Sequence, residues 1–556
     1  MNIRWLNEYS QGFLEKDYLA KGQTVENRIQ VVGDFAEKIL KAQCKTIKDS
    51  EYFDGFSQKL QSYIAKGWIS LSTPIWANFG TNRGLPISCF GSVIGDSIES
   101  ILDTVAEIGT MCKYGGGTSG YFGNIRSRGS LINGGGISNG TKPFLEPFQT
   151  ITNVVSQGQL RRGYFAAYTD IYHGDIEEWL NIRAEGDPIQ HITWGVNVPT
   201  WWLNQMREGD KEKRRIWAKV IQKRFETGLP YIYFTDNANN SESTPKIYRN
   251  KGLLKASQMC TEIMLPSNED SSFVCDLGSL NDLYYEEYKD TDCVEVLTCL
   301  LDAAITEFVI KASSIKHFEK AVKFAEEHRA LGIGRLGYHS LLQNKMIAFE
   351  SLQARYLNVE IQKNIKIKSE NASKKLAEMF GECLWTKDTG MRNTTTQAIA
   401  PTTSSAFIMQ VSQSIEPWNS NYFIKDLAKG KFVIKNRYLQ KLLQEKGLDN
   451  DETWNSIKMN HGSVLHLDSL SNEEKFVFKT AKEINQEEIV IQAAQRQKYI
   501  DQGQSLNLFI SSDKTAKEVN ELILKAHDMG IKSLYYQHNS SAVANLTKEL
   551  TCISCE

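Results

Sequence analysis

The stretch Ser257–Cys275, SQMCTEIMLPSNEDSSFVC, places an amide, a thiol and a carboxylate at alternate positions, Gln258, Cys260 and Glu262. In an extended chain, side chains at positions i, i+2 and i+4 lie on one face, so the three groups would point in the same direction. A second thiol, Cys275, follows thirteen residues after the carboxylate. The stretch is therefore a candidate reaction centre. For the pattern by itself, the alternative is an ordinary buried cysteine among surface polar residues.

The composition is that of a folded protein with a net charge close to zero. The chain has 556 residues, of which 41% are hydrophobic and 23% charged, and these values exclude a disordered or fibrous class. Lys and Arg total 64 and Asp and Glu total 66, so the net charge of −2 gives no general attraction to nucleic acid or membrane. We find neither a secretory leader nor an apolar run of roughly 18 residues. We therefore expect a cytoplasmic protein that binds neither nucleic acid nor membrane.

The pattern of apolar residues predicts helices at the start of the chain and an α/β arrangement after it. Apolar residues recur at helical spacing within residues 1–70, 96–114 and 351–380. From about residue 190, short β-rich runs such as WGVNVPTWW alternate with helix-forming runs such as EKRRIWAKVIQKRFE, which is typical of an α/β fold. Near the end, TAKEVNELILKAHDMG predicts a helix that leads into a strand, IKSLYYQHN.

Two segments combine glycine and arginine in a way that suits phosphate binding. Residues 115–141 are rich in Gly, Ser and Asn and contain Arg126 and Arg128, and Arg161 and Arg162 follow in SQGQLRRGYF. Glycine permits close backbone approach and arginine pairs with phosphate. A flexible surface loop is the alternative for each segment.

The segment PTTSS, residues 401–405, precedes an apolar, helix-compatible run. Proline in a first helical turn, with hydroxyls and free N–H groups around it, makes a phosphate site; an ordinary helix cap is the alternative. Gly332, Gly334 and Gly337 satisfy G-x-G-x-x-G, but the residues before them predict a helix end and not the strand that a dinucleotide site requires. We interpret them as packing glycines.

Ten cysteines in 556 residues are too few for a disulfide scaffold, so we expect mostly free thiols in a reducing compartment. Cys552 and Cys555 form a C-x-x-C pair at the end of the sequence. Tetrahedral zinc requires four ligands and no matching pair occurs elsewhere, so dithiol exchange explains this pair better than a metal does. We expect no metal ligands in this chain.

Taken in order, these motifs resemble the large, catalytic subunit of class I ribonucleotide reductases, from LNEYSQGFLEKDYL to the final CISCE. The resemblance implies an α/β fold, a ten-stranded α/β barrel with an N-terminal helical domain and a flexible C-terminal tail. The implied boundaries are 1–70 for the helical domain, 71–538 for the barrel, with a small inserted subdomain at about 350–400, and 539–556 for a mobile redox tail. The implied reaction is thiyl-radical reduction of the ribose 2′-hydroxyl of ribonucleoside diphosphates, which gives deoxyribonucleotides.

By resemblance, Cys260 is the thiyl residue, Glu262 takes the 3′-hydroxyl proton, and Cys89 and Cys275 reduce the 2′ position and end as a disulfide. The chemistry agrees, because a carboxylate within hydrogen-bond reach can act as base and cysteine supplies both a hydrogen-atom acceptor and a dithiol. Gln258 stands where the family usually has Asn. It keeps the amide and adds a methylene, and we expect activity to survive this departure.

The resemblance assigns further positions to substrate binding and to electron transfer. The substrate-contacting positions are Thr73, Ser88, Thr402, Thr403, Ser404 and Ser405. Tyr535 and Tyr536 match the radical relay that receives the oxidising equivalent from a small, metal-containing subunit. Cys552 and Cys555 match the pair that re-reduces the active site and is itself reduced by a thioredoxin- or glutaredoxin-like protein.

The resemblance also implies an allosteric specificity site for dNTP or ATP effectors at a dimer interface, so we expect a homodimer. Its residues are Asp96, Ser97, Ile98, Arg126 and Arg161. Arg162 replaces a glycine that is common in the family. Many relatives begin with an ATP-binding cone, whereas this sequence starts on the helical scaffold, and we expect no activity-site binding of dATP to this chain.

Two alternatives stay open at this point. An adenosylcobalamin-dependent reductase shares the barrel and the thiols but makes its radical locally, so it needs no tyrosine pair. A nucleotide-binding homologue that has lost its chemistry through Gln258 is the other alternative, although such a chain has no reason to keep a tail dithiol.

Overall fold

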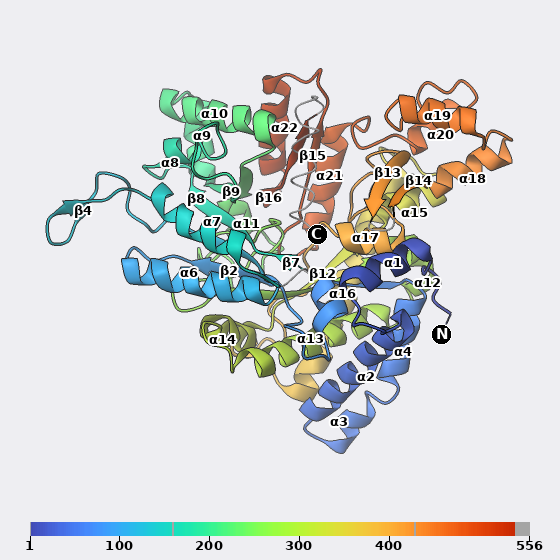
Figure 1. The fold of residues 1–556 in the computed structure, drawn as a ribbon, viewed down its shortest axis with the longest axis horizontal. Coiled ribbons are helices and arrows are strands. Elements are labelled where there is room, and N and C mark those ends of the chain that lie inside the picture. Colours follow the sequence, from blue (N-terminus) through green and yellow to red (C-terminus); the bar gives the residue numbers. More distant parts are fainter. Residues whose placement is uncertain (1, 158–160, 428–429, 540–556) are drawn as a thin grey trace.

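The computed structural model describes residues 2–157, 161–427 and 430–539 (Figure 1). Five strands form its parallel centre: β2 (Cys89–Val93), β3 (Gly117–Tyr121), β8 (Tyr164–Asp170), β9 (Thr193–Val198) and β10 (Tyr231–Phe234). These strands are almost entirely buried, as expected for a parallel sheet covered on both faces.

Four further strands complete a nine-stranded sheet. They are β1 (Ile69–Leu71), β11 (Phe273–Asn281), β12 (Leu331–Leu336) and β16 (Ser533–Leu534). The order is β1-β11-β2-β3-β8-β9-β10-β16. In addition, β12 pairs with β11 on the edge opposite β1. The pairs β1–β11, β2–β11 and β10–β16 are antiparallel.

Two extended segments close this sheet into a ring. Residue 333 of β12 bridges to Gln397, and Ile399 bridges to Gln504. The Tyr535 amide, directly after β16, then donates to the Leu506 carbonyl at 2.9 Å. The predicted α/β barrel is therefore confirmed, with single bridges in place of full strands where the ring closes. Beside it, β15 (Leu508–Ile510) pairs in parallel with β17 (Gln537–Asn539).

The helices predicted from periodicity are present. The first 70 residues form α1 (Glu8–Asp17), α2 (Val25–Gln43), α3 (Ile47–Glu51) and α4 (Phe56–Ala65). The later ones include α6 (Ile98–Lys113), α10 (Lys211–Thr227), α16 (Leu352–Phe380) and α22 (Ala516–Asp528). One apolar core runs without interruption from the N-terminal helices into the barrel, and the boundary at residue 70 stays a prediction.

A satellite core lies beside the barrel, at the upper right of Figure 1. It is built by α18 (Arg437–Glu445), α19 (Asp451–Met459) and α20 (Asn472–Val477), next to the hairpin of β13 (Tyr422–Leu427) and β14 (Gly430–Lys435). The small insert predicted at about 350–400 stays a prediction. In the structure α16 packs on α13 (Cys293–Ala312) and α21 (Gln486–Gln497).

Gly332 and Gly334 lie inside β12, so their pattern does not open a dinucleotide loop. A Cβ atom on Gly332 would lie 2.5 Å from Leu277 Cδ2, and one on Gly334 would lie 2.9 Å from the Ala398 carbonyl oxygen. Their interpretation as packing glycines is confirmed. Within the described part of the chain, no helix is both long enough and apolar enough to cross a membrane.

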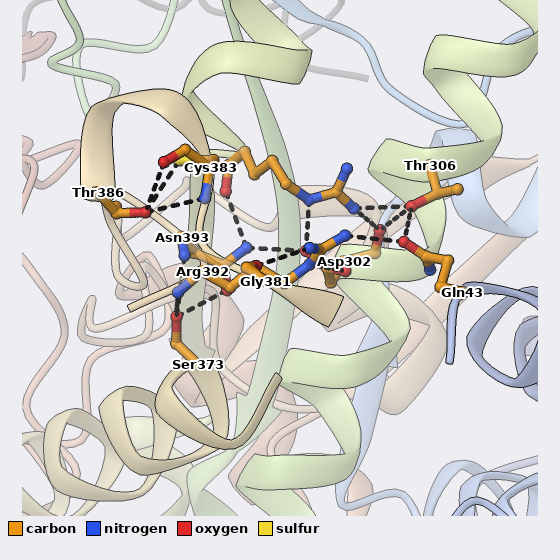
Figure 2. Close-up of polar contacts among 10 residues, drawn as sticks. Gln43, Asp302, Thr306, Ser373, Gly381, Cys383, Thr386, Arg392 and Asn393 are labelled. Carbon is orange, nitrogen blue, oxygen red and sulfur yellow. Dashed lines mark hydrogen bonds and ion pairs between the residues drawn. The ribbon is translucent and has the colours of Figure 1, made fainter. Parts of the chain in front are cut away.

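Figure 2 shows a buried ion-pair cluster that ties several of these segments together. Asp302 of α13 lies 2.9 Å from Arg329 Nε, just after α14 (Glu319–His328), and 2.9 Å from Arg392 Nε. Arg392 also donates to Gln43 of α2 at 2.8 Å. The cluster therefore connects the N-terminal helices to the helical layer around the barrel.

Candidate active site

The segment from Gln258 to Glu262 is a tight turn inside the barrel. The Thr261 amide donates to the Gln258 carbonyl at 3.2 Å, and Thr261 has a left-handed φ of +69°. The Gln258 side-chain oxygen also accepts the Cys260 amide, a local side-chain contact of the kind that favours turns over strands. The predicted extended conformation is therefore wrong. The three side chains still converge, because the turn brings them together.

Gln258 and Glu262 are almost completely buried, at 2% and 1% exposure. Gln258 Nε2 donates to Glu262 Oε1 at 2.7 Å. The other carboxylate oxygen, Oε2, lies 2.9 Å from the hydroxyl of Ser505, which also lies 2.5 Å from the Cys260 carbonyl oxygen. The carboxylate is thus held from both sides in one orientation.

Residues remote in sequence anchor this turn to the barrel. The Tyr168 hydroxyl on β8 donates to the Gln258 carbonyl at 2.8 Å, and the Ser533 hydroxyl on β16 donates to the Thr261 carbonyl at 2.9 Å. Burial raises the pKa of Tyr168 well above its ordinary value, and the nearby Cys260, Glu262 and Tyr536 groups raise it further.

Cys89 and Cys275 face each other across an antiparallel pair, β2 and β11. Side chains directly opposite in such a pair have Cβ atoms about 4.5–5.5 Å apart, which is near the range that a disulfide spans; no disulfide joins the two thiols in the structure. Burial raises the pKa of Cys275 well above its ordinary value, while a hydrogen bond from Gln502 Nε2, at 3.4 Å, opposes this effect.

One cavity brings most of the predicted catalytic and substrate-binding residues together. Its lining includes Thr73, Ser88, Cys89, Gln258, Cys260, Glu262, Thr402, Thr403, Ser404 and Ser405. Cys275 does not line the cavity but is paired directly opposite Cys89 across β2 and β11. The sulfur that the cavity presents beside Cys260 is therefore that of Cys89.

Two short helices begin at this cavity. α5 (Thr73–Asn78) starts after Ser72, and α17 (Thr403–Met409) starts after Thr402. Unpaired N–H groups at helix N-termini favour anions. Ser72 also lines the cavity, and its hydroxyl is buried without a hydrogen-bond partner among the described residues. This wall is suited to bind phosphate oxygens.

Tyr535 and Tyr536 follow β16 directly and are buried, with their ring centroids 4.4 Å apart. The predicted strand is interrupted here, since β17 begins only at Gln537. Tyr231 of β10 lies against both rings, at 4.9 and 5.1 Å. The three rings form one buried aromatic cluster next to the strand that anchors the Thr261 carbonyl.

Three of the residues predicted for the specificity site, Asp96, Ser97 and Ile98, lie at the start of α6. Ser97 caps the helix, accepting the Ser100 amide at 3.1 Å, and Ile98 is 55% exposed. Asp96 pairs with Arg126 Nε at 2.7 Å. The structure describes the backbone of Arg161 in β7 (Arg161–Arg162) but not its side chain. Cys552 and Cys555 lie outside the described residues.

Sequence patterns did not point to Tyr168, Gln502 or Ser505. Ser505 and Gln502 lie in the same segment, IDQGQSLN, which has one charged residue, Asp501, and no spacing of residues that marks a site. They enter the site because this segment closes the barrel beside the turn at Cys260.

Comparisons with known proteins point to one family. The family model described as "Ribonucleotide reductase, barrel domain" matches residues 87–213, 202–386 and 384–537. The putative ribonucleoside-diphosphate reductase large subunit of Frog virus 3 (isolate Goorha) is 34% identical and covers 90% of this chain and 92% of its own length. The large subunit of Invertebrate iridescent virus 3 is 33% identical with the same two coverages. The solved structure of the Actinobacillus ureae class Id ribonucleotide reductase alpha subunit has a TM-score of 0.90 and 48% identity, covering 100% of this chain and 99% of its own.

Proposed function

Since the chain belongs to the ribonucleotide reductase large-subunit family, we propose that it is the catalytic subunit of a class I ribonucleoside-diphosphate reductase. The observation that carries this proposal is the shared cavity, where the Cys260 thiol, the Glu262 carboxylate and the Cys89 thiol lie beside two helix N-termini. A diphosphate held at those N-termini would place its ribose toward the three reactive groups.

In the proposed reaction, the Cys260 thiyl radical takes the 3′ hydrogen atom of the ribose, which forms the Cys260 S–H bond and leaves a carbon radical. Glu262 accepts the 3′-hydroxyl proton in the same step, because it is the carboxylate that lines the cavity. The 2′-hydroxyl then leaves as water, and Cys89 and Cys275 supply two electrons and two protons as they form a disulfide. Cys260 finally returns its hydrogen atom to the 3′ position and becomes a radical again, while Glu262 returns the proton to the 3′ oxygen.

Ser505 is a positioning residue in this proposal. Its hydroxyl has a single hydrogen, although both the Glu262 carboxylate and the Cys260 carbonyl lie within reach. While Glu262 is ionised, donation to the carboxylate is favoured because charge-assisted hydrogen bonds are the stronger ones. Once Glu262 holds the substrate proton, it can donate to Ser505, whose hydrogen then turns to the Cys260 carbonyl.

The tyrosine cluster supports a radical that arrives from outside the chain. Tyr535 and Tyr536 are in ring contact and follow the strand whose Ser533 binds the turn at Cys260. A small subunit carrying a metal cofactor would supply the oxidising equivalent through these rings. The adenosylcobalamin alternative has no use for the pair, so the pair favours class I.

The remaining partners are part of the same proposal. A thioredoxin- or glutaredoxin-like protein would reduce the tail pair Cys552 and Cys555, which then re-reduces Cys89 and Cys275. We propose that dNTP or ATP effectors bind at Asp96, Ser97, Ile98, Arg126 and Arg161. Exposed Ile98 and Leu102 on α6, at 55% and 57%, support a homodimer that pairs along this helix.

The test is an assay of CDP reduction with a dithiol reductant and an effector. The proposal expects deoxycytidine diphosphate only when the purified small subunit is present. The Cys260→Ser variant should be inactive, and Cys44→Ser, a half-buried thiol outside the cavity, should retain activity. Product formation with adenosylcobalamin and no small subunit would establish the cobalamin-dependent alternative. Absence of product under every condition would favour the impaired homologue.

A further inference from the structure

The side-chain amide of Gln502 contacts the sulfur of Cys275. Gln502 is completely buried, and its Nε2 lies 3.4 Å from Cys275 Sγ. Two backbone groups fix the orientation of this amide. The Met264 N–H, which can only donate, faces Oε1 at 3.0 Å, and the Leu331 carbonyl, which can only accept, faces Nε2 at 3.0 Å. The group that faces the sulfur is therefore the donor end of the amide.

This donor can follow a negative charge on the sulfur. Nε2 has two hydrogens but three acceptors within reach, since the Thr395 hydroxyl oxygen lies at 3.1 Å in addition to Cys275 Sγ and the Leu331 carbonyl. The Thr395 hydroxyl itself donates to the Leu331 carbonyl at 2.9 Å, so that carbonyl keeps a donor when Gln502 turns away. Charge-assisted hydrogen bonds are the stronger ones. A thiolate at Cys275 would therefore attract both N–H groups of Gln502 and leave no carbonyl unpaired.

The other surroundings of Cys275 disfavour a thiolate. Burial raises the pKa of this thiol, and three groups that carry negative charge when ionised raise it further, whereas the hydrogen bond from Gln502 lowers it. The three groups are Cys89, Asp276 and Glu262. Any step that leaves negative charge on Cys275 therefore depends on Gln502.

The two thiols of the pair differ in access. Cys89 is half-buried and lines the catalytic cavity, whereas Cys275 is 1% exposed and does not line it. A thiolate that enters the cavity can therefore reach the sulfur of Cys89 and not that of Cys275. In thiol–disulfide exchange the attacked sulfur stays in the mixed disulfide, and the other sulfur leaves as a thiolate, faster when its pKa is lower.

We propose that the Cys89–Cys275 disulfide is reopened in one direction only: the reductant attacks Cys89, and Cys275 leaves as a thiolate that Gln502 stabilises. This assignment rests on the proposed function, which supplies the disulfide and the tail dithiol. A thiolate of Cys552 or Cys555 forms a bond to Cys89 Sγ while the Cys89–Cys275 bond breaks, and Cys275 takes the electron pair and then a proton. The second tail thiolate attacks the tail sulfur of the mixed disulfide and releases Cys89, which is protonated in turn. Two electrons and two protons thus pass from the tail pair to Cys89 and Cys275.

The experiment follows the first exchange step in the full-length chain, with Cys552→Ser and Cys555→Ser present so that the tail does not compete. Diamide closes the Cys89–Cys275 disulfide, and 2-mercaptoethanol then serves as the attacking thiol. The reaction is quenched early with acid, and free thiols are labelled with N-ethylmaleimide in guanidinium chloride. Peptide mass spectrometry should find 2-mercaptoethanol on Cys89 and N-ethylmaleimide on Cys275. No nucleotide, small subunit or radical is needed.

Two glutamine variants separate the role of Gln502 from a structural one. Gln502→Met removes the N–H groups at nearly constant length and should slow the exchange about tenfold. The reduction potential of the disulfide in glutathione buffers at pH 7 should stay unchanged, because Cys275 is a protonated thiol once exchange is complete; a displaced sulfur would shift the potential as well. The matched control is Gln492→Met, a completely buried glutamine that donates to the Phe349 carbonyl and accepts the Tyr338 hydroxyl. It should exchange at the rate of the parent chain.

Three results would contradict the assignment. A 2-mercaptoethanol adduct on Cys275, with N-ethylmaleimide on Cys89, would overturn the direction of attack, and this result needs no Gln502 variant to fold. Equal exchange rates in the parent chain, Gln502→Met and Gln492→Met would overturn the role of Gln502. Both results leave the proposed function standing, since deoxycytidine diphosphate formation tests it separately. Failure of diamide to join Cys89 to Cys275 would overturn the proposed dithiol together with its direction of reopening.

Discussion

The amide of Gln258 makes two contacts at once, and shortening it by one methylene should separate them. Its oxygen accepts the Cys260 amide two residues later, and its nitrogen donates to Glu262 at 2.7 Å. Asparagine makes the first type of contact readily, as in an Asx-turn. Its side chain is shorter by one carbon–carbon bond, about 1.5 Å, so the second contact would stretch to roughly 4 Å, beyond hydrogen-bond range. Gln258→Asn should keep the turn and release the carboxylate.

The expected cost follows from the type of bond that is lost. A hydrogen bond to a charged group contributes about 1.5–3 kcal/mol, so turnover of Gln258→Asn should fall by roughly tenfold to a hundredfold. Gln258→Met removes both contacts at nearly constant length and should be the more severe variant. The assay is CDP reduction at saturating small subunit, with thermal unfolding measured in parallel. Because a carboxylate without its donor is easier to protonate, the acid limb of the pH–rate profile should move to higher pH.

The matched control is Gln440→Asn, a partly exposed glutamine of α18 bonded to Asp449, which should leave turnover unchanged. The reasoning is refuted if Gln258→Asn turns over as fast as the wild type or faster while unfolding at the same temperature. That result would mean that the glutamine handicaps the enzyme and that the contact with Glu262 is dispensable.

Three further outcomes are expected. Iodoacetamide at pH 7.5 should label Cys89 at least about tenfold faster than Cys275, because burial raises the pKa of Cys275 and the thiolate is the reactive form; equal labelling by mass spectrometry would contradict this. Leu102→Glu should abolish effector-induced dimers in light scattering, whereas Lys517→Gln should not. Burial acts to raise the pKa of Asp302, but Arg329 and Arg392 outweigh it and hold that pKa well below the ordinary range. The resulting stabilisation is present above the unfolded pKa of about 3.9 and is lost as the pH falls further. Asp302→Asn should cost about 3–5 kcal/mol in urea unfolding at pH 7, and a loss below about 1 kcal/mol would contradict that role.

The sequence predicted the helices and strands better than the contacts between segments that are distant in the chain. Helices such as α6 and α16 follow from local periodicity and from caps such as Ser97, which neighbouring residues determine. The conformation at Cys260 does not follow from local pattern. Alternating polar groups suggested an extended segment, whereas the Gln258 side chain captures the Cys260 amide and turns the chain.

The missed residues share a physical reason. Ser505 and Gln502 reach the site across 243 and 227 positions, and Tyr168 across 90. Such contacts arise only when the barrel closes, and no spacing within one segment encodes them. The five thiols and the tyrosine pair could be assigned only because their order along the chain resembles that of a known family.

The closure of the barrel also explains why the reactive turn can be both strained and fixed. Thr261 keeps its left-handed φ because its carbonyl is bound by Ser533 and the carbonyls on either side of it by Ser505 and Gly503. These three partners come from the segments after residue 500 that close the ring. The geometry at Cys260 is therefore imposed by the C-terminal part of the barrel, which also carries Tyr535 and Tyr536. A substitution that loosens this closure should displace both the Cys260 thiol and the tyrosine pair. Hydrogen-atom abstraction and radical delivery therefore depend on the packing of the same part of the barrel.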